Sequence, residues 1–111
     1  MDGATVEGLR VIFRGLVVWR DLFDRYGSDL QTVIDESGIE WDLMEVELLY
    51  RVSQERLTTR QAQAIRYFLL GNMREEDVAV AMGIKPSNPI GLYATEGLRR
   101  LVEMVDQRLF C

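Results

Sequence analysis

The stretch that decides the fold covers residues 57–101, LTTRQAQAIRYFLLGNMREEDVAVAMGIKPSNPIGLYATEGLRRL. Its apolar residues recur every three or four positions, which is typical of helices that bury one face. Gly71, Gly83 and the pair Asn88-Pro89 interrupt this periodicity. The stretch therefore predicts two short helices, a glycine turn and a third helix, the pattern of a helix-turn-helix with one supporting helix.

Capping signals mark the ends of these helices. Thr58 with Gln61 three residues later has the spacing of a capping box, and Gly71 lies where a C′ glycine would end the helix. Gly83 lies where a left-handed residue would let two helices cross steeply, with Ile84 filling the corner. Asn88-Pro89 is the sequence of an N-cap followed by a proline at the first helical position. The predicted buried stripe of the last helix is Ile90, Ala94, Leu98 and Leu101.

A family resemblance follows from the string LTTRQAQAIRYFLLGNMREEDVAVAMGI. It resembles region 4, the promoter-recognition end, of bacterial sigma factors, whose pattern is Leu-Thr-x-Arg-Gln, an aliphatic helix, Gly, an acidic helix with Ile-Ala, then Gly-Ile or Gly-Val. One extra residue follows Gly71 and another lies in the turn after Lys85. The resemblance covers roughly the C-terminal half. Its matching positions are Leu57, Thr58, Arg60, Gln61, Ile65, Gly71, Glu75, Glu76, Val78, Ala79, Met82, Gly83 and Ile84.

The resemblance implies a DNA-binding surface at the start of the last helix. The residues that it places nearest the bases are Ser87, Asn88, Leu92, Tyr93 and Thr95, and the phosphate contacts are Arg60, Arg74, Lys85 and Arg99. The family carries basic and polar residues on the outward face of this helix. Here those positions are Gly91, Leu92, Tyr93, Thr95 and Glu96, none of which is basic. Arg74 also replaces the family's N-cap Ser or Thr.

The charge distribution favours only weak binding to DNA. The net charge is −5, and residues 1–56 hold twelve acids against six arginines. Residues 57–111 hold six acids against seven bases, so the predicted helix-turn-helix half is nearly neutral. Because phosphate neutralisation by Lys and Arg dominates DNA affinity, we expect double-stranded DNA to be bound weakly by this chain alone. Twelve arginines against one lysine indicate a GC-rich genome, as in actinobacteria or their phages.

Composition argues against catalysis and metal binding. The chain has no histidine, and its single cysteine is Cys111, so no metal site, cofactor or enzyme activity is expected. The acidic run Glu75-Glu76-Asp77 fits the first turn of a helix, where carboxylates favour the helix dipole. No apolar run is long enough for a membrane span and no signal peptide is evident, so we expect a cytoplasmic protein without a membrane partner.

The front half, residues 1–56, is predicted to pack on or extend the helix-turn-helix half as one compact domain. Its first helix carries an apolar seam, Leu9, Ile12, Leu16, Trp19, Phe23 and Tyr26, while Arg10 and Arg14 mark the solvent side. Gly8 and Gly15, seven residues apart, indicate close packing of another helix. The seam either covers the core or forms a homodimer. A later helix begins with a capping box at Asp42 and Glu45, and its expected apolar face is Met44, Leu48, Leu49 and Val52.

The predicted fold class is all-α, a bundle of about six helices. Helices are expected near residues 4–26, 29–36, 42–53, 59–70, 74–82 and 89–107. The expected core of the C-terminal half is Ile65, Phe68, Leu69, Val78, Met82, Ile84, Leu98 and Leu101, with Leu16, Trp19 and Phe23 packing against it or against a second copy.

Three functions fit this sequence. The first is a small transcription-associated DNA-binding regulator that acts with RNA polymerase. The second is a degenerate helix-turn-helix used as a protein-interaction module, for instance a phage protein that targets host RNA polymerase or another host protein through Leu92 and Tyr93. The third, the DNA-binding small subunit of a phage packaging enzyme, fits the helical content but has no residue of its own to support it.

Overall fold

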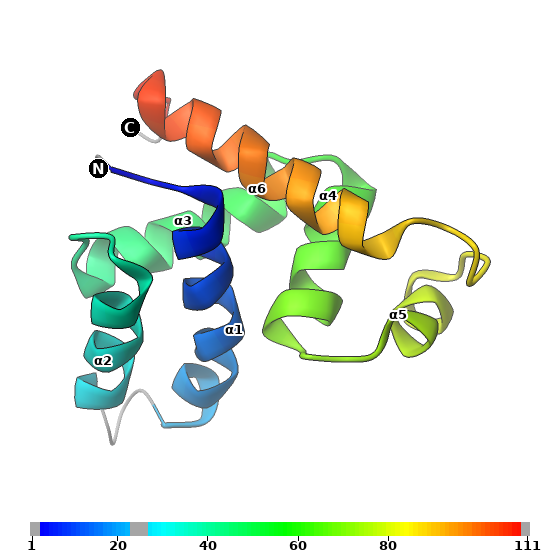
Figure 1. Ribbon diagram of the computed structural model, residues 1–111, viewed down its shortest axis with the longest axis horizontal. Coiled ribbons are helices and arrows are strands. Elements are labelled where there is room, and N and C mark those ends of the chain that lie inside the picture. The colour runs from blue at the N-terminus through cyan, green and yellow to red at the C-terminus, as the bar shows by residue number, and fades with distance from the viewer. Residues whose placement is uncertain (1–2, 23–26, 110–111) are drawn as a thin grey trace.

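The computed structural model describes the backbone of residues 3–22 and 27–109 and the side chains of residues 3–15 and 31–109. Within these residues the chain forms six α-helices, one π-helix and no strand, which confirms the all-α prediction. In order they are α1 (Val6–Leu22), α2 (Gly27–Ser37), α3 (Leu43–Glu55), α4 (Thr59–Ala64), η1 (Ile65–Leu70), α5 (Glu75–Met82) and α6 (Ile90–Asp106) (Figure 1). Each corresponds to a predicted range, except that the range 59–70 is divided between α4 and η1.

Helices α1 and α2 lie side by side as an antiparallel pair (Figure 1). A Cβ added at Gly8 would lie 2.6 Å from Ile39 Cδ1, and one added at Gly15 would lie 2.3 Å from Val33 Cγ1. Only glycine permits these approaches, because real Cβ atoms do not come this close to other heavy atoms. The two glycines therefore set the close packing that their spacing predicted.

One hydrophobic core joins the two halves of the chain. Leu9, Ile12 and Phe13 of α1 are fully buried and belong to the same cluster as Leu98 and Leu101 of α6. The first two residues of the predicted seam on α1, Leu9 and Ile12, therefore lie inside a single copy of the chain. The remaining members of the seam, Leu16, Trp19, Phe23 and Tyr26, lie outside the described side chains.

Helix α3 has the predicted capping box and buries part of the predicted face, Leu49 and Val52. Asp42 accepts a hydrogen bond from the Glu45 backbone N–H at 2.8 Å, and Glu45 Oε1 accepts one from the Asp42 N–H at 3.1 Å. Met44, expected in the core, is 79% exposed, whereas Val46 is fully buried. Two overlapping apolar stripes run along this helix, and packing against the rest of the bundle buries the one formed by Val46, Leu49 and Val52.

The supporting helix begins and ends where predicted, but its second half is a π-helix. Thr58 caps α4 in a capping box with Gln61. The following turns widen into η1, where the Gly71 N–H donates to the Arg66 carbonyl, five residues back, at 2.9 Å. Gly71 has φ −80°, and the left-handed residue is Asn72 with φ 50°. The helix therefore ends at Leu70, as predicted, with Gly71 as its C-cap, and the left-handed residue is Asn72, since asparagine tolerates this conformation.

The glycine turn is confirmed at Gly83. This residue ends α5 with φ 70° and ψ 32°, the left-handed conformation that glycine adopts without a steric cost. Its N–H donates to the Val80 carbonyl, and the Ile84 N–H donates to the Ala79 carbonyl. Arg74 occupies the N-cap of α5 without a side-chain capping hydrogen bond.

The start of α6 differs from the predicted cap. Pro89 is the N-cap and Ile90 the first helical residue, so Asn88 lies outside the helix. The Asn88 side-chain amide donates instead to the Lys85 carbonyl at 2.9 Å and closes the turn before the helix. Of the predicted core, Ile65, Leu69, Val78, Leu98 and Leu101 are buried, whereas Phe68, Met82 and Ile84 are only partly buried against it.

Candidate nucleic-acid interface

Three of the predicted site residues meet between α4 and the turn before α6. Arg60 lies in the first turn of α4, which the Thr58–Gln61 capping box orients. Its Nη1 donates to the Tyr93 hydroxyl at 2.9 Å and to Asn88 Oδ1 at 3.3 Å. Its guanidinium carbon also lies 5.6 Å from the centre of the Tyr93 ring. We call these residues the Arg60–Asn88–Tyr93 cluster.

This cluster uses side chains that were predicted to contact DNA. The Tyr93 hydroxyl donates to Asn88 Oδ1 at 3.1 Å, so both polar groups of the Asn88 amide are engaged within the protein. The Tyr93 hydroxyl is likewise both a donor and an acceptor inside the cluster. The arrangement ties α4 to the turn and fixes the direction in which α6 begins.

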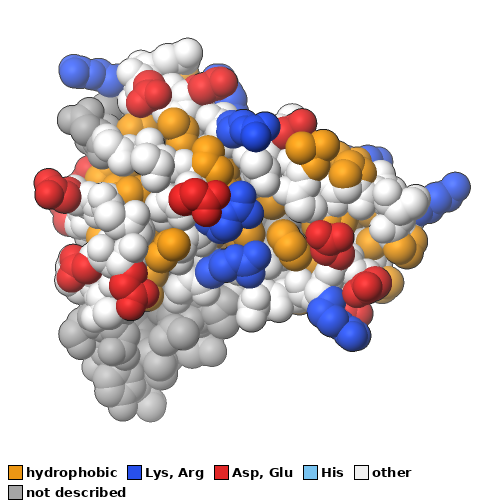
Figure 2. Space-filling view, viewed as in Figure 1, with side chains coloured by type: hydrophobic (Ala, Val, Ile, Leu, Met, Phe, Trp, Pro, Cys, Tyr) orange, Lys and Arg blue, Asp and Glu red, His pale blue; other side chains and the backbone are white. Residues whose placement is uncertain are grey.

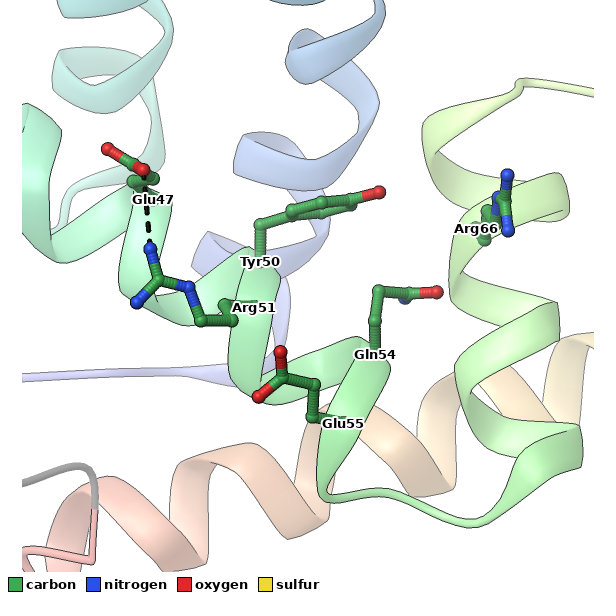
Figure 3. A pocket seen from close by; sticks show the side chains of 6 residues that line it. All are labelled: Glu47, Tyr50, Arg51, Gln54, Glu55 and Arg66. Atoms are coloured by element: carbon green, nitrogen blue, oxygen red, sulfur yellow. Dashed lines mark hydrogen bonds and ion pairs between the residues drawn. The ribbon is translucent and has the colours of Figure 1, made fainter.

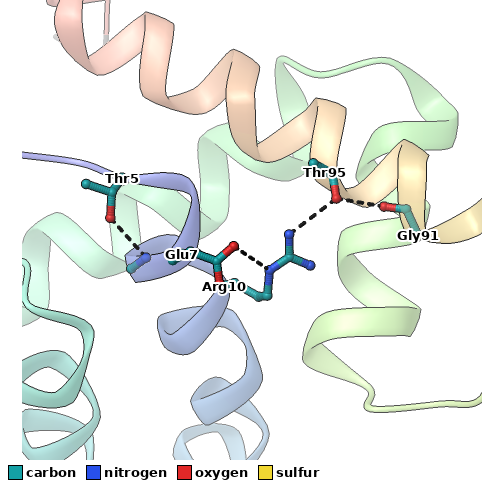
Figure 4. Close-up of polar contacts among 6 residues, drawn as sticks. Thr5, Glu7, Arg10, Gly91 and Thr95 are labelled. Atoms are coloured by element: carbon teal, nitrogen blue, oxygen red, sulfur yellow. Dashed lines mark hydrogen bonds and ion pairs between the residues drawn. The ribbon is translucent and has the colours of Figure 1, made fainter.

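Thr95 faces helix α1. Its Oγ1 donates to the Gly91 carbonyl at 2.9 Å and accepts a hydrogen bond from Arg10 Nη2 at 3.3 Å (Figure 4). Arg10 also lies 3.7 Å from a Glu7 carboxylate oxygen. The opposite edge of α6 packs on α4 and η1, because a Cβ added at Gly97 would lie 3.3 Å from Gln61 Cβ and 2.9 Å from Ile65 Cδ1. Because both edges of α6 are covered, fewer of its side chains face solvent than the sequence pattern predicted.

The outward face of α6 has mixed charge. Leu92 is 47% exposed, and Glu96, Arg99, Arg100 and Glu103 follow it along the exposed side. Arg100 forms an ion pair with Glu103 at 3.3 Å. The other two charged residues of this face, Arg99 and Glu96, have opposite signs and lie close together on the helix. Figure 2 shows the same mixture over the coloured part of this view, with basic side chains gathered near its middle and acidic ones interspersed.

The remaining predicted phosphate contacts lie around the two ends of α5. Arg74, before the helix, pairs with Asp77 at 3.3 Å, and both side chains are largely exposed. Exposed ion pairs of this kind are worth about 0–1 kcal/mol and exchange easily for a phosphate. Lys85 and Ser87 are exposed in the turn after the helix.

Two arginines of α1 were not predicted to belong to this region. Arg10 reaches Thr95, and Arg14 donates to Asn72 Oδ1 at 3.1 Å while its guanidinium carbon lies 5.4 Å from the centre of the Phe68 ring. These partners are 85 and 58 residues away in the sequence. No local pattern could have revealed them, because only the packing of α1 on the C-terminal half creates the contacts.

A separate groove lies on the side of the bundle formed by α3 and η1. Its volume is about 370 Å³, and it is open, with an ion pair between Glu47 and Arg51 at one end and Arg66 at the other (Figure 3). Among the described residues, no group of three or more His, Cys, Asp or Glu side chains is arranged to hold a metal ion.

The part of the chain that the structure describes contains no helix that is both long and apolar enough to span a membrane. In comparisons with known proteins, no family model matches the sequence, and no curated protein or solved structure is significantly similar to it.

Proposed function

We propose that this chain is a non-enzymatic, transcription-associated protein in which α5 and α6 act as a helix-turn-helix resembling sigma region 4. The observation that carries the proposal is the left-handed Gly83 between the two helices, together with the position of the first turn of α6 on the side of the molecule remote from the α1–α2 pair (Figure 1). In a helix-turn-helix, the start of the second helix enters the major groove.

The proposed roles follow from the surroundings of each side chain. Leu92 and Ser87 are exposed near the start of α6 and would lie closest to the bases. Arg60, Arg74, Lys85 and Arg99 would contact phosphates. The polar groups of Asn88, Tyr93 and Thr95 are used within the fold, so we propose that these residues hold α6 in position. Base-specific contacts would then be few, and a protein partner such as RNA polymerase would supply the remaining affinity.

Binding of a labelled random duplex at a series of salt concentrations tests this proposal. Four phosphate contacts correspond to a slope of log affinity on log salt of roughly −3 to −4. The double variant Arg74→Ala, Lys85→Ala should make the slope shallower by about two. The matched control is Arg51→Ala with Arg66→Ala, which removes two positive charges from the groove beside α3. Absence of salt-dependent binding by the intact protein at low ionic strength would refute the DNA proposal.

A second candidate function is a protein-interaction module, and exposed apolar residues favour it. Val80 on α5 is 77% exposed and Leu92 on α6 is 47% exposed. Exposed apolar side chains on two neighbouring helices are typical of contact surfaces for another protein. This function predicts that Leu92→Ser with Val80→Ser abolishes association with purified host RNA polymerase while leaving the binding of duplex DNA unchanged.

A further inference from the structure

Arginines from two distant parts of the chain line up on one face of the molecule. Arg10 and Arg14 are one helical turn apart on α1, and both reach across to the C-terminal half. Arg10 contacts Thr95, and Arg99 follows Thr95 by one helical turn on α6. We call Arg14, Arg10 and Arg99 the arginine strip.

We propose that the arginine strip binds consecutive phosphates of a DNA backbone, so that α1 acts as a backbone clamp beside the helix-turn-helix. This inference rests on the proposed function and adds Arg10 and Arg14 to the contacts named there. The view in Figure 2 shows basic side chains near the middle of the face where α1 meets α6 in Figure 1.

The hydrogen bonds of the strip leave its arginines able to bind an anion. A guanidinium has five N–H donors, and Arg14 uses one for Asn72 while Arg10 uses one for Thr95. Phe68 under Arg14 also holds its guanidinium in place. Side chains that are already ordered lose less conformational entropy when they bind a phosphate, which favours these two residues over freely rotating surface arginines.

The nearby acids limit the strength of this surface without blocking it. Glu7 lies 3.7 Å from Arg10, but its side chain is 83% exposed and the pair is long. Such a pair is weak and screened by salt. Glu96 opposes binding beside Arg99. The strip should therefore contribute strongly salt-dependent affinity and no base specificity.

The test compares three double variants with the intact protein on the labelled random duplex across salt. With Arg10 and Arg14 added, the wild-type slope should be roughly −5. Arg10→Gln with Arg14→Gln should make it shallower by about two, whereas Arg10→Lys with Arg14→Lys should keep it, because lysine preserves the charge. Arg51→Gln with Arg66→Gln, on the groove beside α3, should leave the wild-type slope unchanged. A wild-type slope in the Gln variant would overturn the inference.

A second measurement on the intact protein covers the case in which the Gln variant fails to fold. The Nε–H signals of Arg10 and Arg14 in a nitrogen–proton correlation spectrum should shift when duplex is added, while that of Arg51 should not. Unshifted Arg10 and Arg14 signals would overturn the inference even if DNA binds.

The two proposals can fail separately. If Arg74→Ala with Lys85→Ala is silent but the Gln variant weakens binding, the helix-turn-helix proposal fails and the strip stands. If the Gln variant is silent but Arg74→Ala with Lys85→Ala weakens binding, the arginine-strip proposal alone fails. If the protein does not bind DNA at all, both proposals fail.

Discussion

The Tyr93 hydroxyl accepts a hydrogen bond from Arg60 at 2.9 Å and donates one to Asn88 at 3.1 Å. One phenol group thereby connects the first turn of α4, the turn before α6 and the first turns of α6 itself. The link runs across 33 residues of sequence, and it orients the end of α6 that is proposed to meet DNA.

Replacing Tyr93 by phenylalanine should remove this link while keeping the ring. We expect a loss of about 1 kcal/mol in the free energy of unfolding, since a net hydrogen bond is worth about 0.5–1.5 kcal/mol and the cluster is partly solvated. Urea denaturation measures the loss. Tyr50→Phe is the control, because the Tyr50 hydroxyl points into the open groove, and its effect should stay within about 0.5 kcal/mol (Figure 3). Equal effects of the two variants would show that the cluster does not stabilise the fold.

Two glycines of α6 should respond oppositely to alanine. A Cβ at Gly91 would lie 3.4 Å from the Glu75 carboxylate, an ordinary contact, so Gly91→Ala should stabilise by up to about 1 kcal/mol through helix propensity. A Cβ at Gly97 would lie 2.9 Å from Ile65 and 3.3 Å from both Gln61 and Leu57. Overpacking costs about 1–3 kcal/mol, so Gly97→Ala should lower the melting temperature. A stabilising Gly97→Ala would place α6 further from α4 than described.

Substitution at Gly83 should destabilise through the backbone alone. Its φ is +70°, and a Cβ there would meet nothing within 4 Å. Gly83→Ala should cost about 1–2 kcal/mol and Gly83→Val more, because a β-branched residue is poorly tolerated at positive φ. Gly83→Asn should cost less than either, since asparagine adopts this conformation more readily. Thermal unfolding of the three variants would give this order, and an unchanged melting temperature for Gly83→Val would refute the strain argument.

Two leucines on α6 provide a matched comparison of burial. Leu98 is fully buried and Leu92 is 47% exposed. Leu98→Ala should cost about 2–5 kcal/mol through lost contacts and a residual cavity, whereas Leu92→Ala should stay within about 0.5 kcal/mol. Chemical denaturation distinguishes them, and similar losses for both would mean that the buried stripe of α6 is wrongly assigned.

Local signals in the sequence were sufficient for most of the helices. The capping boxes at Asp42 and Thr58 were predicted correctly, because capping involves residues three apart and depends on little else. The turn at Gly83 was also predicted correctly, because glycine adopts the left-handed conformation without a steric cost. Local signals were misleading where two faces of one helix carry apolar residues at helical spacing. In α3, Met44 was expected in the core but is exposed, and Val46 is buried instead.

The sequence by itself determined the all-α class, the helix order and the stripe Ile90, Ala94, Leu98 and Leu101, all of which are buried in α6. Only the tertiary structure decided what the polar side chains of the candidate site contact. Arg10 meets Thr95 and Arg60 meets Tyr93 because α1 and α4 pack on opposite edges of α6. Helical periodicity specifies which side of a helix is buried, but the partner of a polar group at the edge of that side depends on the neighbouring helix that packing places there.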